Sequence, residues 1–300
     1  MLFNTSNISI DTITAEFLHH KNISLSVIRL DKIHPVVSGN KLFKLHFFLE
    51  EAILCSKTGI LTFGGAYSNH LVATAWLCKT NGLKSVGIVR GEKPLVLSHT
   101  LLACIAYGME LQFISREAYN EKEKYDFLDK LSEQWKNYLF IPEGGYHPKG
   151  AAGAALITKF IDKDTSHICT AIGTATTFAG LIEGAGKDQQ IIGIPVLKGM
   201  TDIKARVSYL TASTHPFQLL EDYHFGGYAK KTPELINFMN TIYEQNKLPT
   251  DFVYTAKLMY AIFDAIKKSF FEKGSKIMCV HTGGLQGNNS LPKGSLSFKI

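Results

Sequence analysis

From residue 41 onward, helical and strand patterns alternate along the chain, and this alternation constrains the fold more than any other feature. The stretch KLFKLHFFLEEAIL (41–54) has its apolar residues on one helical stripe, at Leu42, Leu45, Leu49 and Ala52. GILTFGG (59–65) is then typical of a short buried strand that runs into a glycine turn. A helix followed by a buried strand is the unit of an α/β protein.

The same alternation continues to about residue 197. It predicts helices at 68–82, about 97–107, about 117–137, near 149–162 and from about 176, and strands at 84–91, 109–115, 137–145, 167–173 and 189–197. This order predicts mostly parallel sheets covered on both faces, with ligands at the loops that leave the carboxyl ends of the strands. IHPVVSGN (33–40) and EGGYHPKG (143–150) are the expected crossing points between two lobes.

Composition and charge argue against membrane and nucleic-acid partners. Of 300 residues, 45% are hydrophobic, yet no stretch approaches the roughly 18 consecutive apolar residues that a membrane span needs. The net charge is +6, without a block of five or six basic residues, so a nucleic-acid partner is not expected. The polar, acidic start differs from a signal peptide. We expect a soluble, cytoplasmic protein with no membrane and no nucleic-acid partner.

The cysteines are odd in number and scattered among apolar neighbours, at Cys55, Cys78, Cys104, Cys169 and Cys279. They lack CxxC spacing and Cys/His ligand spacing, so no metal site is expected. Buried free thiols in a reducing compartment are the expectation.

Two strand-to-helix turns carry glycine and hydroxyl residues: FGGAYSNH (63–70) and IGTATTFAG (172–180). Each exposes backbone N–H groups in front of a helix dipole, which suits a phosphate or a carboxylate. For either loop alone, simple helix capping by Ser or Thr is the competing interpretation. Neither loop matches GxxxxGK[ST] or GxGxxG, which disfavours a nucleoside triphosphatase and a dinucleotide enzyme.

The stretch SGNKLFKL (38–45) places Lys41 and Lys44 three residues apart at the start of the first helix. These lysines form either a solvated helix start or a pair that includes a reactive amine. A lysine-bearing helix start together with the two glycine turns favours anion binding by those turns over simple capping.

Six motifs occur in the order found in one known group. They are GNK followed by KL (39–45), GGAYSNH (64–70), GTATTFAG (173–180), GGYAKKTPE (226–234), VYTAKLMYAIFDAI (253–266) and HTGGLQG (281–287). Over about residues 10–290 the chain resembles the pyridoxal-phosphate enzymes grouped as 1-aminocyclopropane-1-carboxylate deaminases and D-cysteine desulfhydrases. The resemblance implies the tryptophan synthase β-like fold (fold type II), two-lobed and three-layered α/β/α with mostly parallel sheets. It also implies a large cofactor-binding domain (1–44 plus 148–300), a small α/β domain (45–147) and a homodimer.

The resemblance assigns roles at the first two motifs. Lys41 matches the lysine that forms the Schiff base with pyridoxal 5'-phosphate. Lys44 matches a lysine that can reach the phosphate, with a solvated lysine as the alternative. Asn69 matches the asparagine that hydrogen-bonds the ring hydroxyl, and Ser68 matches the serine beside the substrate carboxylate and Cα.

Further roles follow from the later motifs. The phosphate loop comprises Gly173, Thr174, Ala175, Thr176 and Thr177. Ala175 stands where glycine is common in the family, and an N–H is still available there. Tyr228 and Tyr254 match the two active-site tyrosines; on their own, such tyrosines would be taken as core or surface residues.

Two positions separate the activities within the family. In the deaminases a glutamate at the pyridine nitrogen follows the second tyrosine, and a leucine precedes the late Gly-Gly. This chain has Thr255 and Thr282 there, as in the desulfhydrases. The cyclopropane substrate has no α-hydrogen and needs a strong electron sink, whereas D-cysteine has an acidic Cα–H and a thiolate leaving group.

The sequence therefore predicts a lyase that acts on a small D-amino acid, most directly D-cysteine, and yields pyruvate, ammonia and sulfide. Lys41 or Tyr254 is expected to remove the α-proton. The alternatives are 1-aminocyclopropane-1-carboxylate deaminase, a β-replacing or racemising relative, and a pyridoxal-phosphate carrier without turnover.

Overall fold

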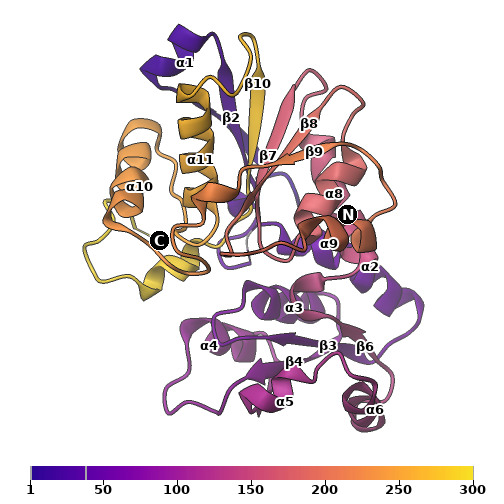
Figure 1. Cartoon of the computed structure of the whole chain (residues 1–300). Coiled ribbons are helices and arrows are strands. Elements are labelled where there is room, and N and C mark those ends of the chain that lie inside the picture. The colour runs from indigo at the N-terminus through magenta and orange to yellow at the C-terminus, as the bar shows by residue number, and fades with distance from the viewer. Residues whose placement is uncertain (1, 38, 300) are drawn as a thin grey trace. The chain divides into compact units, whose positions relative to one another are not determined.

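The computed structural model describes residues 2–37 and 39–299, which form two compact units (Figure 1). The first unit comprises residues 2–3 and 41–150, and the second comprises the described residues of 4–40 and 151–299. The chain crosses from one unit to the other at the ends of IHPVVSGN and EGGYHPKG; in the former, Ser38 lies outside the described residues. The domain boundaries expected from the sequence, at 44/45 and 147/148, stay a prediction.

The first unit is built on a four-stranded parallel sheet. Its strand order is β5 (Met109–Ile114), β4 (Lys84–Arg90), β3 (Gly59–Gly64) and β6 (Tyr138–Ile141). The longer helices of this unit are α2 (Lys41–Leu54), α3 (Asn69–Thr80), α4 (His99–Ala106) and α6 (Tyr125–Gln134), with the short α5 (Arg116–Asn120). All four strands run parallel, as the alternating sequence pattern predicts.

Helices cover both faces of this sheet, and Gly87 shows how. Val86 and Ile88 pack with Tyr119 of α5 and Leu131 of α6 in one apolar cluster. Gly87 lies between them in β4, so it faces the other side. A Cβ there would lie 3.2 Å from the side chain of Leu71 in α3. The sheet is therefore sandwiched between α5 and α6 on one face and α3 on the other.

The helix predicted at about 117–137 is two helices, so that prediction was wrong. The structure has α5 and α6 separated at residues 121–124. The connecting sequence, Glu121–Lys124, consists of charged residues alone and supplies no apolar side chain to the core. A helical turn there would have no apolar face to pack, and packing of an apolar face supplies most helical stability in proteins.

The second unit contains a six-stranded sheet. Its order is β1 (Ser9–Ile13), β2 (Ser24–Arg29), β10 (Lys276–His281), β7 (His167–Ile172), β8 (Gln190–Pro195) and β9 (Phe217–Leu219). Among the described strands only β1 runs antiparallel, against β2. The helices of at least eight residues are α7 (Pro148–Ala155), which begins in the first unit, α8 (Thr176–Gly184), α9 (Ile203–Leu210), α10 (Pro233–Asn246) and α11 (Thr255–Lys267).

Alternation along β8 again shows which helices cover which face. Ile192 and Ile194 belong to an apolar cluster with α11, α10 and the short α1 (Glu16–Lys21). Gly193 between them faces the other side, where its Cβ would meet Phe178 of α8. Figure 1 shows α10 and α11 together and α8 and α9 together in this unit. The α/β fold class predicted from the sequence is confirmed.

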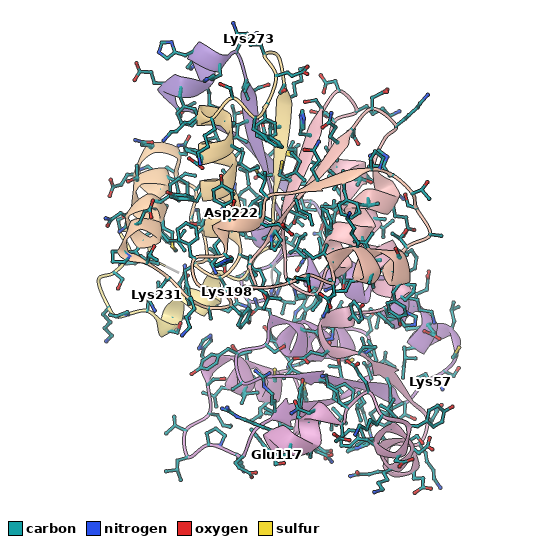
Figure 2. All side chains as sticks on the ribbon, viewed as in Figure 1. Lys57, Glu117, Lys198, Asp222, Lys231 and Lys273 are labelled. Carbon is teal, nitrogen blue, oxygen red and sulfur yellow. The ribbon has the colours of Figure 1, made fainter. Side chains whose placement is uncertain are left out.

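The structure differs from two further expectations, on the helix near 149–162 and on the burial of the cysteines. Residues 149–162 form α7 and a 3-10 helix (Leu156–Phe160) rather than one helix. All five cysteines are free; four are buried, but Cys55 is exposed, contrary to expectation. Charged side chains such as Glu117, Lys231 and Lys273 project outward (Figure 2). Among the described residues, no helix combines the length and apolar character that a membrane crossing requires.

Candidate active site

The lysine pair stands at the start of α2, which begins at Lys41 itself. Lys44 is only 2% exposed, and its side chain lies close to Gly145, where a Cβ would be 3.5 Å from Lys44 Cε. Burial lowers the pKa of Lys44 well below its usual range, and the charge of Lys41 lowers it further. Lys44 is therefore not a solvated lysine. Two amines within electrostatic range at a helix start favour an anion.

The glycine turn after β3 places Ser68 and Asn69 at the start of α3. The backbone at Gly64 comes so close to this helix that a Cβ would lie 2.6 Å from Ser68 Oγ, so only glycine fits. Ser68 caps the helix, its oxygen accepting the N–H of Leu71 at 3.4 Å. The hydroxyl hydrogen can still be donated to an anion. The capping and anion-binding interpretations of this loop are therefore compatible.

His70 is a candidate that sequence reasoning missed, although it belongs to the motif GGAYSNH. Its Nε2 lies 2.9 Å from Thr62 Oγ1, and that hydroxyl donates to the carbonyl of Ile141. Nε2 is therefore the donor, and Nδ1 is unprotonated. Burial, with the charges of Lys44 and Lys41, lowers the pKa of His70 well below its usual range. Nδ1 is a buried acceptor with no hydrogen-bond partner among the described residues.

The second anion loop follows β7 in the second unit. Ala175 takes a left-handed conformation (φ +66°, ψ −7°) directly before α8, and no described side chain caps that helix. The N–H groups of its first turn are thus not capped by a side chain, as an anion site requires. Thr174 and Thr176 share a hydrogen bond of 2.9 Å between their hydroxyls. Thr176 and Thr177 are buried.

The left-handed backbone at Ala175 gives a first prediction. We expect Ala175→Gly to leave the free energy of unfolding within about 0.5 kcal/mol of wild type. Relief of the left-handed strain, about 1–2 kcal/mol, offsets glycine's greater chain entropy and the lost methyl group. The buried Ala179, which lies inside α8, is the matched control, and Ala179→Gly should cost at least about 1 kcal/mol. Urea unfolding of both variants measures this; equal losses would contradict the prediction.

Asn40, directly before Lys41, is held by a side chain and a backbone carbonyl of the second unit. Its Nδ2 donates to Thr177 Oγ1 at 2.6 Å, and its N–H donates to the carbonyl of Thr282 at 3.2 Å. Gly39 has φ +85°, and a Cβ there would lie 2.0 Å from the same carbonyl oxygen. The motif GNK therefore needs glycine for close approach and asparagine as an anchor. The role of Asn40 was not predicted from the sequence, although the residue belongs to the motif GNK.

The two predicted active-site tyrosines are neighbours. The rings of Tyr228 and Tyr254 lie 6.1 Å apart at 69°, an edge-to-face arrangement. A Cβ at Gly173 would lie 3.1 Å from Tyr254 Cε1, so the anion loop lies against this pair. Tyr228 is 55% exposed. The structure thus brings Gly173, Tyr228 and Tyr254 together in the second unit.

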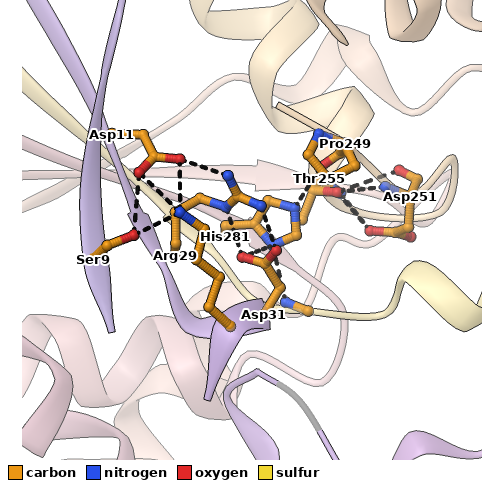
Figure 3. A network of polar contacts seen from close by, with 10 residues as sticks. Ser9, Asp11, Arg29, Asp31, Pro249, Asp251, Thr255 and His281 are labelled. Atoms are coloured by element: carbon orange, nitrogen blue, oxygen red, sulfur yellow. Dashed lines mark hydrogen bonds and ion pairs between the residues drawn. The ribbon is translucent and has the colours of Figure 1, made fainter. Parts of the chain in front are cut away.

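Thr255 forms a closed hydrogen-bonded box with Asp251 (Figure 3). Its Oγ1 accepts the N–H of Asp251 at 2.7 Å and donates to Asp251 Oδ1 at 2.7 Å. The same carboxylate accepts the N–H groups of Val253, Tyr254 and Thr255 at 2.9 Å. Burial raises the pKa of Asp251, and these N–H and hydroxyl bonds oppose the rise. The proton of the Thr255 hydroxyl is therefore committed to Asp251.

A buried ionic network lies beside Thr282, which directly follows β10 (Figure 3). Arg29 makes two bonds to Asp31, at 2.8 and 2.6 Å, and one to Asp11 at 2.5 Å. His281 Nδ1 lies 3.2 Å from Asp31, and Nε2 donates to the carbonyl of Pro249 at 2.9 Å. Arg29, Asp31 and His281 are nearly inaccessible to solvent. The network anchors the end of β10, and sequence reasoning missed all of it.

The predicted site residues therefore fall into two sets, one in each unit. Lys41, Lys44, Ser68 and Asn69 belong to the first unit, and Gly173 to Thr177, Tyr228, Tyr254, Thr255 and Thr282 belong to the second. Each set contains donors of a kind that pyridoxal 5'-phosphate can use: an amine, a buried lysine and an amide in the first set, and backbone N–H groups without a side-chain cap in the second. The unpartnered Nδ1 of His70 adds a buried acceptor to the first set.

Parallel sheets with loops of this kind after β3 and β7 are typical of α/β proteins that bind a ligand at the carboxyl ends of their strands. The model of the family described as pyridoxal-phosphate dependent enzyme matches residues 12–283. The chain belongs to this family. It is an enzyme that depends on pyridoxal phosphate, and the fold expected from the resemblance is confirmed.

Two curated relatives and one crystal structure are similar to this chain over most of its length. The chain is 32% identical, over 286 residues, to a putative 1-aminocyclopropane-1-carboxylate deaminase from Thermotoga maritima, covering 88% of this chain and 89% of the relative. It is 25% identical over 282 residues to the D-cysteine desulfhydrase of Salmonella choleraesuis, with 86% of each covered. The crystal structure of a 1-aminocyclopropane-1-carboxylate deaminase homologue matches with a TM-score of 0.80 and 25% identity, covering 96% of this chain and 92% of that one.

Proposed function

We propose that this chain is a lyase that removes the β-substituent of a small D-amino acid, most directly the thiol of D-cysteine, giving pyruvate, ammonia and sulfide. Lys41 would hold the cofactor covalently, Lys44 and the 173–177 loop would hold its phosphate, and Asn69 its ring hydroxyl. When bound, the cofactor supplies the electron sink for the charge that develops at Cα.

The observation that carries this proposal is the bond from Thr255 to Asp251. The resemblance implies that Thr255 stands at the pyridine nitrogen of the cofactor, where the deaminases have glutamate. The only proton of the Thr255 hydroxyl is donated to Asp251 Oδ1. It therefore offers the nitrogen neither a negative charge nor a free donor, and such a site favours the substrate that needs the weaker sink.

D-cysteine is that substrate because its chemistry starts with a proton transfer. Its Cα–H can be removed by Lys41 or by Tyr254, and the thiolate leaves readily from Cβ. Ser68 can donate its hydroxyl hydrogen to the substrate carboxylate. The cyclopropane amino acid has no α-hydrogen, so the opening of its ring requires a strong electron sink. This difference in demand is what supports the desulfhydrase over the deaminase.

The test is ammonia release by the cofactor-loaded protein, given D-cysteine, L-cysteine and 1-aminocyclopropane-1-carboxylate in parallel. We expect D-cysteine to be turned over at least about tenfold faster than either competitor, a difference of about 1.4 kcal/mol in barrier. Sulfide and pyruvate should appear in equal amounts with ammonia. Faster release from the cyclopropane substrate would contradict the assignment made from Thr255.

The deaminase is the second candidate, and one observation favours it. Relatives at 30–32% identity are named putative 1-aminocyclopropane-1-carboxylate deaminases, whereas a relative named for both activities is 28% identical and relatives named for D-cysteine desulfhydrase alone are 25% identical. A carrier without turnover is disfavoured because Ser68, Tyr228 and Tyr254, the groups for proton transfer, are all retained.

We also propose a cytoplasmic homodimer. The resemblance to the family supports the dimer, and the five free cysteines, which suit a reducing compartment, support the location. Sedimentation of the purified protein at micromolar concentration should give about twice the 33.3 kDa mass of one chain. A monomer across that range would contradict the dimer.

A further inference from the structure

Lys257 in α11 is a fully buried lysine that the proposed chemistry does not use. The residue has no exposed surface, and its Nζ donates to the carbonyls of His224 at 2.8 Å and Gly227 at 2.7 Å. No carboxylate lies within ion-pair distance of it among the described residues. Burial lowers its pKa to about 8, and the charge of Asp251 opposes this shift. Burying an amine without a paired carboxylate costs free energy, and its hydrogen bonds to the protein offset part of that cost.

The turn that Lys257 binds is conformationally strained. Four residues in a short stretch have positive φ: Phe225 (+50°), Gly226 (+90°), Gly227 (+118°) and Ala229 (+54°). Two of them, Phe225 and Ala229, carry side chains, for which the left-handed region is unfavourable. A stretch of this kind persists only when surrounding contacts determine it.

The two carbonyls bound by Lys257 are the ones that close this turn. The carbonyl of His224 also accepts the N–H of Gly227 at 3.0 Å, and the carbonyl of Gly227 accepts the N–H of Lys230 at 3.2 Å. The Lys257 amine therefore binds both carbonyls that close two consecutive turns, 224–227 and 227–230. Each carbonyl has two lone pairs, so both bonds form without competition.

Tyr228 follows Gly227 directly, and more than half of it is exposed, so little packing fixes its ring. Tyr254 stands directly before α11, and Lys257 lies one helical turn further along. The Nζ bonds therefore tie the turn that carries Tyr228 to the helix that begins after Tyr254. We propose that Lys257 is a positioning residue that holds Tyr228 at its place beside Tyr254. The inference rests on the proposed function only for its kinetic readout.

The first test is hydrogen exchange in the cofactor-loaded protein, which needs no substrate. Lys257→Met fills most of the same volume but cannot donate. We expect exchange in residues 224–231 to rise at least about tenfold, while exchange in β7 and the end of α11 stays unchanged. Lys267→Met, the same change in the same helix, is the matched control and should leave all three regions as in wild type. Unchanged exchange at 224–231 in Lys257→Met would overturn the proposal.

Lys257→Gln provides a second variant should the methionine protein fail to fold. The amide keeps two N–H donors on a shorter stem, so it should give exchange rates between those of wild type and Lys257→Met. If Lys257→Gln exchanged at the wild-type rate, this would also contradict the proposal. The two carbonyls would then not depend on a side chain as long as that of lysine.

The second test is a double-mutant cycle on turnover with Tyr228→Phe, Lys257→Met and the double variant. Displacement of a catalytic group by about 1 Å can cost about 100-fold, so Lys257→Met should lower kcat about 10- to 100-fold with little change in KM. In the Tyr228→Phe background the same change should cost less than about twofold. Equal losses in both backgrounds would show a general structural role and overturn the proposal. Absence of wild-type turnover would instead refute the proposed function, and the exchange experiment would still decide the role of Lys257.

Discussion

Replacing Lys41 with alanine is expected to abolish turnover and covalent attachment of the cofactor while both units stay folded. Lys41 is the first residue of α2, where alanine is the best helix former, so the fold should tolerate the change. Loss of its proton transfer alone should lower kcat by about 10²- to 10⁴-fold. Borohydride reduction followed by peptide mapping should tag Lys41 in wild type and no lysine in the variant.

Lys44→Met is the matched comparison for this experiment. Lys44 is buried beside Lys41, and a bound phosphate would favour its charged form, so Lys44→Met should weaken cofactor binding about 10- to 100-fold, the value of a charge-assisted hydrogen bond of about 1.5–3 kcal/mol. The covalent tag should stay on Lys41. A tag on Lys44 in wild type, or substantial turnover by Lys41→Ala, would contradict the assignment.

The elements and site residues that could be predicted from the sequence are those determined by neighbouring residues. The apolar stripe of 41–54 gives the helix that Lys41 begins, and Gly64 with Ser68 gives a strand-to-helix turn whose capping is local. Repeated turns of this kind are what made the α/β class predictable. The break between α5 and α6 was missed because helical propensity alone does not reveal where a turn has nothing to bury.

What escaped prediction depends on residues far apart in the chain. The burial of Lys44 depends on Gly145, and the place of Asn40 depends on Thr177 and Thr282. The role of Thr255 likewise could not be read from its identity, because its hydroxyl could donate to a ligand or to Asp251. Only the fold shows that the proton goes to Asp251.

Arg29→Met is expected to lower the free energy of unfolding by about 3–5 kcal/mol at neutral pH, because it leaves the carboxylate of Asp31 buried without its guanidinium. Arg206→Met is the matched control. Arg206 pairs with Asp202 at 2.8 Å, but both side chains are about a third to a half exposed, so its loss should cost less than about 1 kcal/mol. Equal losses in the two variants would show that the buried network adds little.

The dependence of that loss on pH tests its electrostatic origin. Burial alone would raise the pKa of Asp31, but the charge of His281 and the bonds from Arg29 together lower it below its usual value near 3.8. The stability that Asp31 contributes is therefore complete above about pH 4 and is lost as the pH falls through the folded-state pKa. Without Arg29 the carboxyl is buried with less compensation and its pKa rises. The difference between wild type and Arg29→Met should then grow from pH 3 to pH 6.

The choice of probe matters for this measurement. Both tryptophans, Trp76 and Trp135, belong to the first unit, whereas Arg29 and Asp31 belong to the second. Far-ultraviolet circular dichroism reports unfolding of both units, and tryptophan fluorescence reports the first alone. A midpoint shift seen by both probes would mean that the units unfold together, and a shift seen by circular dichroism alone would place the loss in the second unit. A difference between the two proteins that stays constant from pH 3 to pH 6 would contradict the electrostatic account, because packing defects do not titrate with Asp31.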